Sequence, residues 1–229
     1  MKLCYHPAST TSRPILQFCV DAGIDYDPVV VDLMTGEHVR EPYASFNPNC
    51  MVPAVDDDGF VLTESSAILK YLAEKHRSPA YPTDLKQRAR VNEMMDWFNA
   101  NLYREYGYHP VYPQILPHHA RQTDVVNQAT IEWGRAQACT MLQILNDHYL
   151  GQGKPYLCSD TLTIADYFAA ALLTVGELIG NEFSGYPNIE RWLQSMKEMP
   201  SWSAVNEVHN GFAASLKGKS FVTLARAAQ

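Results

Sequence analysis

The sequence of 229 residues lacks the features that mark membrane and secreted proteins. Its longest apolar run, residues 167–179, is interrupted by Gly176 and Glu177 and is too short to span a bilayer. No apolar signal-peptide core follows Met1 and Lys2. These absences predict a cytoplasmic protein that has no membrane as a partner.

Basic segments are also missing. The chain has 18 Lys and Arg residues against 25 Asp and Glu residues, which gives a formal net charge of −7. Because a protein binds nucleic acid by neutralising phosphates with clustered cations, this composition argues against nucleic acid as a partner.

The cysteines form no recognisable motif. They are five in number, lie far apart and show neither a Cys-x-x-Cys pair nor a metal-ligand spacing. The adjacent His118 and His119 lie in a proline-rich segment, where such a pair is more often solvated than bound to a metal. We therefore expect reduced thiols and no metal site.

What the chain does have is enough apolar material for a sizeable core. Hydrophobic residues make up 46% and charged residues 19% of the sequence, which suits one large or two small domains. A polar connector with prolines at residues 77–87 divides two differently patterned parts. We expect domains at 1–77 and 87–229, joined by a linker at 78–86.

The first part predicts the order β-α-β-α-β-β-α. An Asp-Gly turn between two short β-type runs indicates a hairpin, and Thr63 is well placed to cap the helix that follows. The expected elements are a strand in 1–7, a helix at 12–22, a strand in 24–33, a weak helix in 35–48, a hairpin in 52–65 and a helix at 64–76.

Two details of this part fit a thioredoxin-like domain. The hydroxyl residues Ser9, Thr10, Thr11 and Ser12 lie where the first strand meets the first helix. The pair Val52–Pro53 opens the third strand, where that fold carries a cis-proline, although cis X-Pro bonds make up only about 5–6% in folded proteins.

The second part predicts an all-α helical bundle. Apolar residues recur at helical spacing in 85–106, 123–150, 161–180 and 186–202. Three prolines in residues 106–119 predict an interruption, and Thr163 with Asp166 predicts a capping box. The fold class is therefore an α/β thioredoxin-like domain followed by a helical bundle.

Several segments together resemble the glutathione S-transferase family, and most of all its serine-type, theta-like group. They are "STTSRP" after the first strand, "NPNCMVPAV" around the proline, "LTESSAILKYL" at the third helix, and "LTIAD" and "YPNIERWLQSMKEMPSW" in the helical part. The resemblance implies glutathione as co-substrate, a small electrophile as second substrate, and a homodimer.

The resemblance assigns the catalytic serine to Ser9, with Thr10 and Thr11 near enough to substitute for it. A free thiol titrates near pH 8.5, so an enzyme must stabilise the reactive thiolate with hydrogen-bond donors and a helix N-terminus. The hydroxyl would donate to the sulfur of glutathione and would not itself be the nucleophile. The alternative is that all four hydroxyl residues only cap the helix.

Glutathione itself would lie along the first domain. Ser65 and Glu64 would take the γ-glutamyl carboxylate and ammonium, and the backbone at Val52 and Pro53 would pair with the cysteinyl amide. The candidate glutathione-binding residues are His38, Met51, Val52, Pro53, Glu64 and Ser65.

The sequence departs from the theta pattern at the glycine end of glutathione. A lysine often precedes the Val-Pro pair in that group, but this chain has Met51, and Val39 follows His38. Arg13 and Arg40 are the cations that would compensate.

The second substrate would lie between the domains, against a tyrosine-rich wall. The candidates are Tyr103, Arg104, Tyr106, Tyr108 and Tyr112. Such a wall suits a flat or halogenated electrophile, and its phenols would polarise a leaving group. The alternative is that several of these side chains pack between domains or subunits.

Three readings of the function stay open at this point. The first is an enzyme in which the glutathione thiolate attacks an electrophilic carbon. The second is a protein of the same fold that binds glutathione or a hydrophobic ligand without turnover, and the third is an interaction scaffold. Ser9, Pro53 and the Glu64–Ser65 pair favour the first two readings.

Overall fold

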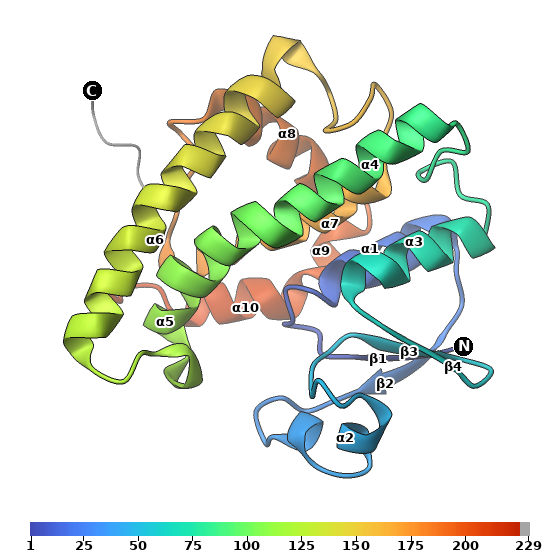
Figure 1. Cartoon of the computed structure of the whole chain (residues 1–229), viewed down its shortest axis with the longest axis horizontal. Helices are drawn as coiled ribbons and strands as arrows, with labels where there is room; N and C mark the ends of the chain where they lie inside the picture. Colours follow the sequence, from blue (N-terminus) through green and yellow to red (C-terminus); the bar gives the residue numbers. More distant parts are fainter. Residues whose placement is uncertain (225–229) are drawn as a thin grey trace.

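A computed structural model describes residues 1–224. A small sheet with its helices forms the N-terminal part, and a larger bundle of helices forms the rest (Figure 1). This arrangement confirms the predicted fold class. Among the described residues, no helix is long and apolar enough to cross a membrane.

The sheet has four strands in the order β2-β1-β3-β4. Strand β1 pairs in parallel with β2 and antiparallel with β3, and β3 pairs antiparallel with β4. The strands are β1 (Lys2–Tyr5), β2 (Asp27–Val30), β3 (Ala54–Asp57) and β4 (Phe60–Thr63).

Helices cover both faces of this sheet. On one face lie α1 (Arg13–Ala22) and α3 (Ser65–Lys75), and on the other lie η1 (Glu37–Val39) and α2 (Tyr43–Phe46) (Figure 1). Helix α1 buries Ile15, Phe18 and Cys19, as their spacing predicts, and ends at Gly23, whose φ of 63° is the left-handed conformation that glycine adopts readily. The element order β-α-β-α-β-β-α is confirmed.

The C-terminal part is helical throughout. Its elements are α4 (Leu85–Trp97), η2 (Phe98–Leu102), η3 (Arg104–Val111), α5 (Tyr112–Ile115), η4 (Pro117–His119), α6 (Asp124–Ile144), η5 (Leu145–Tyr149), η6 (Gly151–Gly153), α7 (Ile164–Leu173), η7 (Thr174–Ile179), α8 (Pro187–Lys197), α9 (Trp202–Val205) and α10 (Glu207–Ser215). Helix α7 is buried along its whole length, and α1 packs against it.

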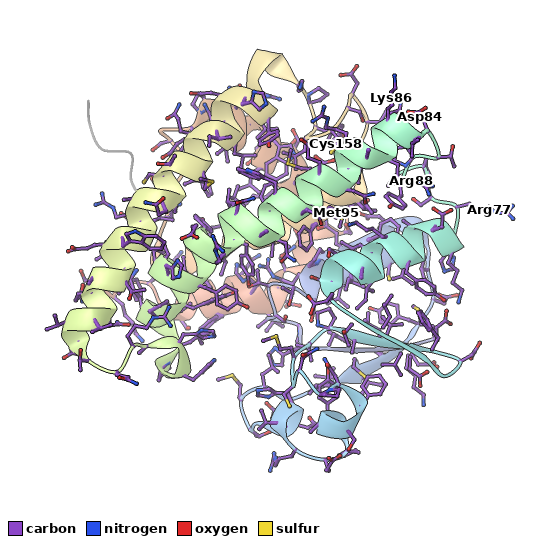
Figure 2. The ribbon with its side chains drawn as sticks, in the orientation of Figure 1. Arg77, Asp84, Lys86, Arg88, Met95 and Cys158 are labelled. Carbon is purple, nitrogen blue, oxygen red and sulfur yellow. The ribbon has the colours of Figure 1, made fainter. Side chains whose placement is uncertain are left out.

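Helix α4 begins beside the end of α3 (Figure 2). The Asp84 side chain caps α4 by accepting hydrogen bonds from the backbone N–H groups of Lys86 and Gln87. One turn later, Arg88 Nη2 lies 2.8 Å from Glu74 Oε2 of α3. This ion pair thus links the start of α4 to α3 of the N-terminal part.

The predicted interruption at residues 106–119 is wrong for most of its length. The chain stays helical from α4 to Ile115 because η2 and η3 are π-helical, and the wider π turn accommodates Pro110, which has no N–H to donate. The helix ends at Leu116, directly before Pro117.

Two capping predictions had different outcomes. The Thr163–Asp166 capping box at the start of α7 is confirmed, and the Asp166 carboxylate also accepts from Trp192 Nε1 at 3.0 Å. The predicted Thr63 cap is wrong. Helix α3 begins at Ser65 after Glu64, and no side chain caps it.

Candidate functional site

The hydroxyl cluster lies at the start of α1. Thr11 Oγ1 donates to the backbone oxygen of Val52 at 3.0 Å, and Ser9 Oγ lies 3.2 Å from Thr11 Oγ1. A hydroxyl has one proton, and that of Thr11 goes to Val52, so Ser9 is the donor toward Thr11. The backbone N–H of Ser12 donates to Ser9 Oγ at 3.2 Å.

Ser12 is the residue before α1, but its side chain makes no capping bond, and its hydroxyl oxygen is buried without a hydrogen-bond partner among the described residues. The N–H groups of the first turn are therefore not satisfied by a Ser12 cap. The capping interpretation therefore fails for the Ser12 side chain, whereas Ser9 Oγ does accept a backbone N–H group at this helix start.

The Val52–Pro53 peptide bond is cis, as the pattern predicts. Both residues are buried, and Ala54 begins β3 directly after them. The Thr11 hydrogen bond joins this strand entry to the start of α1, so the two predicted parts of the thiol site are in direct contact.

Glu64 and Ser65 lie at the start of α3. Glu64 has a φ of 66°, a strained value for a non-glycine residue, and its side chain is exposed. Ser65 is buried at the first position of an 11-residue helix, where backbone N–H groups attract an anion. The pair therefore presents an acidic side chain beside an anion-binding helix start.

The residues at the glycine end of the predicted glutathione site are less polar than the Glu64–Ser65 pair. His38 is half-buried in η1, and its Nδ1 has no hydrogen-bond partner among the described residues. Met51 is 58% exposed and Val39 57% exposed.

The two arginines expected to compensate there lie in different surroundings. Arg40 donates to the backbone oxygens of Gly36 and Thr35 within its own loop. Arg13 is buried and turned into the helical domain, so the expectation that it serves the glycine end is wrong.

Three of the predicted tyrosines form one aromatic wall. The rings of Tyr103, Tyr108 and Tyr112 contact one another edge to face, with centroids 5.3–6.2 Å apart. The Tyr112 hydroxyl donates to Thr10 Oγ1 at 3.0 Å, which ties the wall to the hydroxyl cluster. Burial, and after it the negative charge of Glu64, raises the pKa of Tyr108.

Tyr106 and Arg104 lie elsewhere. Tyr106 is fully buried, and its hydroxyl donates to the backbone oxygen of Leu173 at 2.8 Å. It therefore belongs to the core of the helical domain, and the prediction that it lines the wall is wrong. Arg104 Nε donates to Glu105 Oε1 at 2.8 Å. Glu105 in turn contacts His109, whose ring packs against Trp133 of α6.

His119 contacts the wall, although the sequence predicts that it is solvated. Its ring stacks on Tyr112 with centroids 5.1 Å apart and meets Tyr108 edge to face. Burial and the nearby His118 and Arg121 lower the pKa of His119, which favours the neutral ring. No signal in the sequence marks this contact, because it depends on where η4 turns back over α5.

The thiols of Cys4 and Cys19 are poorly suited to catalysis. Burial raises the pKa of Cys4 and raises that of Cys19 to about 12, which disfavours a reactive thiolate. Within residues 1–224 no group of three His, Cys, Asp or Glu side chains is arranged to hold a metal ion. The hydroxyl groups at the start of α1 are able to donate hydrogen bonds.

Comparison with known proteins agrees with this geometry. Residues 3–74 match the family model "Glutathione S-transferase, N-terminal domain", and residues 120–200 match "Glutathione S-transferase, C-terminal domain". The chain belongs to the glutathione S-transferase family, whose members are transferases.

The relatives also confirm the theta-like resemblance. Human glutathione S-transferase theta-2B is 32% identical over 206 residues, which cover 88% of this chain and 82% of that protein. Human glutathione S-transferase theta-1 is 31% identical over 220 residues, covering 93% and 88%. A structure of human glutathione transferase theta-2 in complex with glutathione and an unknown ligand has a TM-score of 0.85 at 29% identity, covering 96% of this chain and 92% of that one.

Proposed function

We propose that this protein is a glutathione transferase that holds the glutathione thiolate over the N-terminus of α1. The observation that carries the proposal is the Ser9–Thr11–Val52 hydrogen-bonded network, which joins donors at a helix start to the strand entry at Pro53. The helix contributes about 0.3–1 kcal/mol and a hydroxyl donor about 1.5–3 kcal/mol. Together they would lower the thiol pKa by about 1–3 units.

Ser9 is the proposed donor, with Thr10 and Thr11 beside it. The Ser65 helix start would bind the γ-glutamyl carboxylate, and Glu64 its ammonium group. The backbone at Met51, Val52 and Pro53 would pair with the cysteinyl amide as an added strand does. His38 would reach the glycine carboxylate through its unpartnered nitrogen.

The second substrate would be a hydrophobic, flat or halogenated electrophile held against Tyr103, Tyr108 and Tyr112. The thiolate sulfur forms a bond to the electrophilic carbon, and a halide or other leaving group departs with its electron pair. Tyr108 is only half-buried, and its raised pKa keeps the phenol protonated, so it is the proposed donor to the leaving group.

We also propose the domain boundaries 1–77 and 87–229, with 78–86 as linker, and a homodimer. Phe60, on the edge strand β4, is 51% exposed, and a subunit contact would cover it. Light scattering on the purified protein tests the dimer, since a monomer at working concentrations contradicts it.

A second candidate is a glutathione-binding protein without turnover. The exposed Met51 and Val39 favour it, because the glycine end of glutathione has few cations to meet. Weak retention on immobilised glutathione together with absent turnover is the result expected for this candidate, and an interaction scaffold would not be retained at all.

The test is a panel of halogenated, epoxide and hydroperoxide electrophiles assayed with wild type and Ser9→Ala. We expect conjugation by wild type and a loss of about 10–100-fold in kcat/KM for the variant, since a donor to the charged sulfur is removed. The exposed Ser203→Ala is the matched control and should keep the wild-type rate. Absence of turnover across the panel, with glutathione bound, contradicts the enzyme proposal.

A further inference from the structure

Three buried hydroxyl groups form a chain from the aromatic wall to the hydroxyl cluster. The Tyr112 hydroxyl donates to Thr10 Oγ1, and the Tyr103 hydroxyl is hydrogen-bonded to the Tyr112 hydroxyl. The side chains of all three residues are at least nine-tenths buried. These hydrogen bonds thus connect the junction of η2 and η3, and α5, to the segment that opens α1.

The hydrogen bonds between these three hydroxyl groups run in one direction, from Tyr103 through Tyr112 to Thr10. Each hydroxyl carries one proton, and that of Tyr112 goes to Thr10, so Tyr103 must donate to Tyr112. Burial is the main cause that raises the pKa of both Tyr103 and Tyr112, so both phenols keep their protons near neutral pH. Thr10 therefore accepts a hydrogen bond from Tyr112, and its own hydroxyl group faces the Tyr103 oxygen, which acts to lower the pKa of Tyr103.

Ser9 is in a different state. Its proton is directed at Thr11, whose own proton goes to Val52. To donate to a thiolate, Ser9 must leave an existing acceptor. Thr10 would also turn from a neighbour, the Tyr103 oxygen, but a charged sulfur is a stronger acceptor than a neutral phenol. Thr10 is in addition polarised by the donors behind it, because hydrogen bonds in a chain strengthen one another.

The position of Thr10 also fits a role at the sulfur. A nucleophilic sulfur has to lie next to the donors that stabilise it and also next to the wall that holds the electrophile. The Thr10–Tyr112 hydrogen bond is a direct contact between those two groups of residues.

We propose that Thr10 is a second donor to the glutathione thiolate, and that Tyr112 and Tyr103 are positioning residues that direct its proton. The inference rests on the proposed function, since it requires bound glutathione. It also gives the aromatic wall a second role, because two of its buried tyrosines hold a donor to the nucleophile.

The test is ultraviolet titration of the thiolate in complexes of glutathione with wild type, Tyr112→Phe, Thr10→Val and Thr10→Ser. We expect the thiol pKa to rise by about half a unit to one unit in Tyr112→Phe and Thr10→Val, which is about a three- to tenfold loss of thiolate. Thr10→Ser keeps the hydroxyl and should keep the wild-type value. Tyr103→Phe should shift the pKa in the same direction by less.

Tyr106→Phe is the matched control. It removes a buried phenol hydroxyl from the same helical segment. This hydroxyl donates to the Leu173 backbone oxygen and does not take part in the three-hydroxyl chain. Its thiol pKa should equal that of wild type. An equal rise in Tyr106→Phe would assign the effect to packing and overturn the proposal.

The outcomes separate the two proposals. If the thiol is acidified in wild type but Tyr112→Phe and Thr10→Val titrate identically to it, the hydroxyl chain is overturned and the transferase proposal stands. If wild-type protein binds glutathione without acidifying its thiol, the transferase proposal falls, and the second donor falls with it. Calorimetric binding of glutathione by each variant establishes that the site is folded.

Discussion

The Arg13 guanidinium at the start of α1 donates to Asn206 Oδ1, between α9 and α10, at 2.5 Å. It also donates to Thr174 Oγ1 and to the backbone oxygen of Ala171. Arg13 is 1% exposed, and among residues 1–224 no carboxylate forms an ion pair with it. The helix that carries the hydroxyl cluster is therefore fixed to the helical domain by neutral acceptors around a buried cation.

Asn206→Ala should destabilise the fold, because it leaves one N–H of a buried cation without its acceptor. We expect the free energy of unfolding to fall by about 1.5–3 kcal/mol, the range for hydrogen bonds to charged groups. Urea unfolding followed by circular dichroism measures this. Asn210→Ala, an exposed position on α10, is the matched control and should stay within about 0.5 kcal/mol of wild type.

Stability should fall in acid because of His209. Burial, and after it the Arg13 cation, lowers the pKa of this histidine to about 3 in the folded protein, against about 6.5 when unfolded. Between these values the unfolded chain binds a proton that the folded chain does not. The contribution is thus fully present above about pH 6.5 and is lost as the pH falls toward 3, at up to about 1.4 kcal/mol per pH unit.

The measurement is urea unfolding between pH 7 and pH 4 for wild type and His209→Phe. The variant should show a flatter dependence of unfolding free energy on pH. His76→Phe, at an exposed histidine, is the surface control. Parallel pH profiles for wild type and His209→Phe would contradict the assignment.

Gly134→Ala should disturb the aromatic wall, although Gly134 lies in α6 and is not part of the wall. A Cβ at this position of α6 would lie 2.3 Å from the Cβ of His109 and 2.9 Å from the Cδ of Pro110. Both contacts belong to η3, which leads into Tyr112, so we expect a loss of about 1–3 kcal/mol in stability and a raised KM for the electrophile.

Gly211→Ala provides the control for that variant. A Cβ there meets nothing within 4 Å, and alanine is the better helix former by about 1 kcal/mol. We expect Gly211→Ala to be neutral or stabilising in thermal unfolding. If Gly134→Ala is as stable and as active as Gly211→Ala, the tight contact between α6 and η3 has no energetic consequence.

Much of the fold follows from local sequence. The alternating and helical patterns of the first 77 residues predict the order of elements, and the Val52–Pro53 pair predicts the cis peptide bond because the resemblance supplies its context. The Thr163–Asp166 capping box is readable because both partners lie within one turn. These signals involve residues that are close in the chain.

The wall is less predictable because of the π-helical segments. Each extra residue in a helical turn rotates the following side chains by about 100° relative to a regular α-helix. This rotation is why spacing alone does not separate Tyr106, which points into the core, from Tyr103 and Tyr112. The direction of Arg13 is equally hidden, because its acceptors lie 158–193 residues away in the sequence.

The central claim is that the hydroxyl cluster at the start of α1 stabilises a thiolate that glutathione supplies. Ultraviolet titration of glutathione bound to wild type and to Ser9→Ala tests it most directly. We predict a bound thiol pKa about 1–3 units below that of free glutathione in wild type, and a return toward the free value in Ser9→Ala. A bound thiol that titrates in wild type as it does in free glutathione would contradict the account.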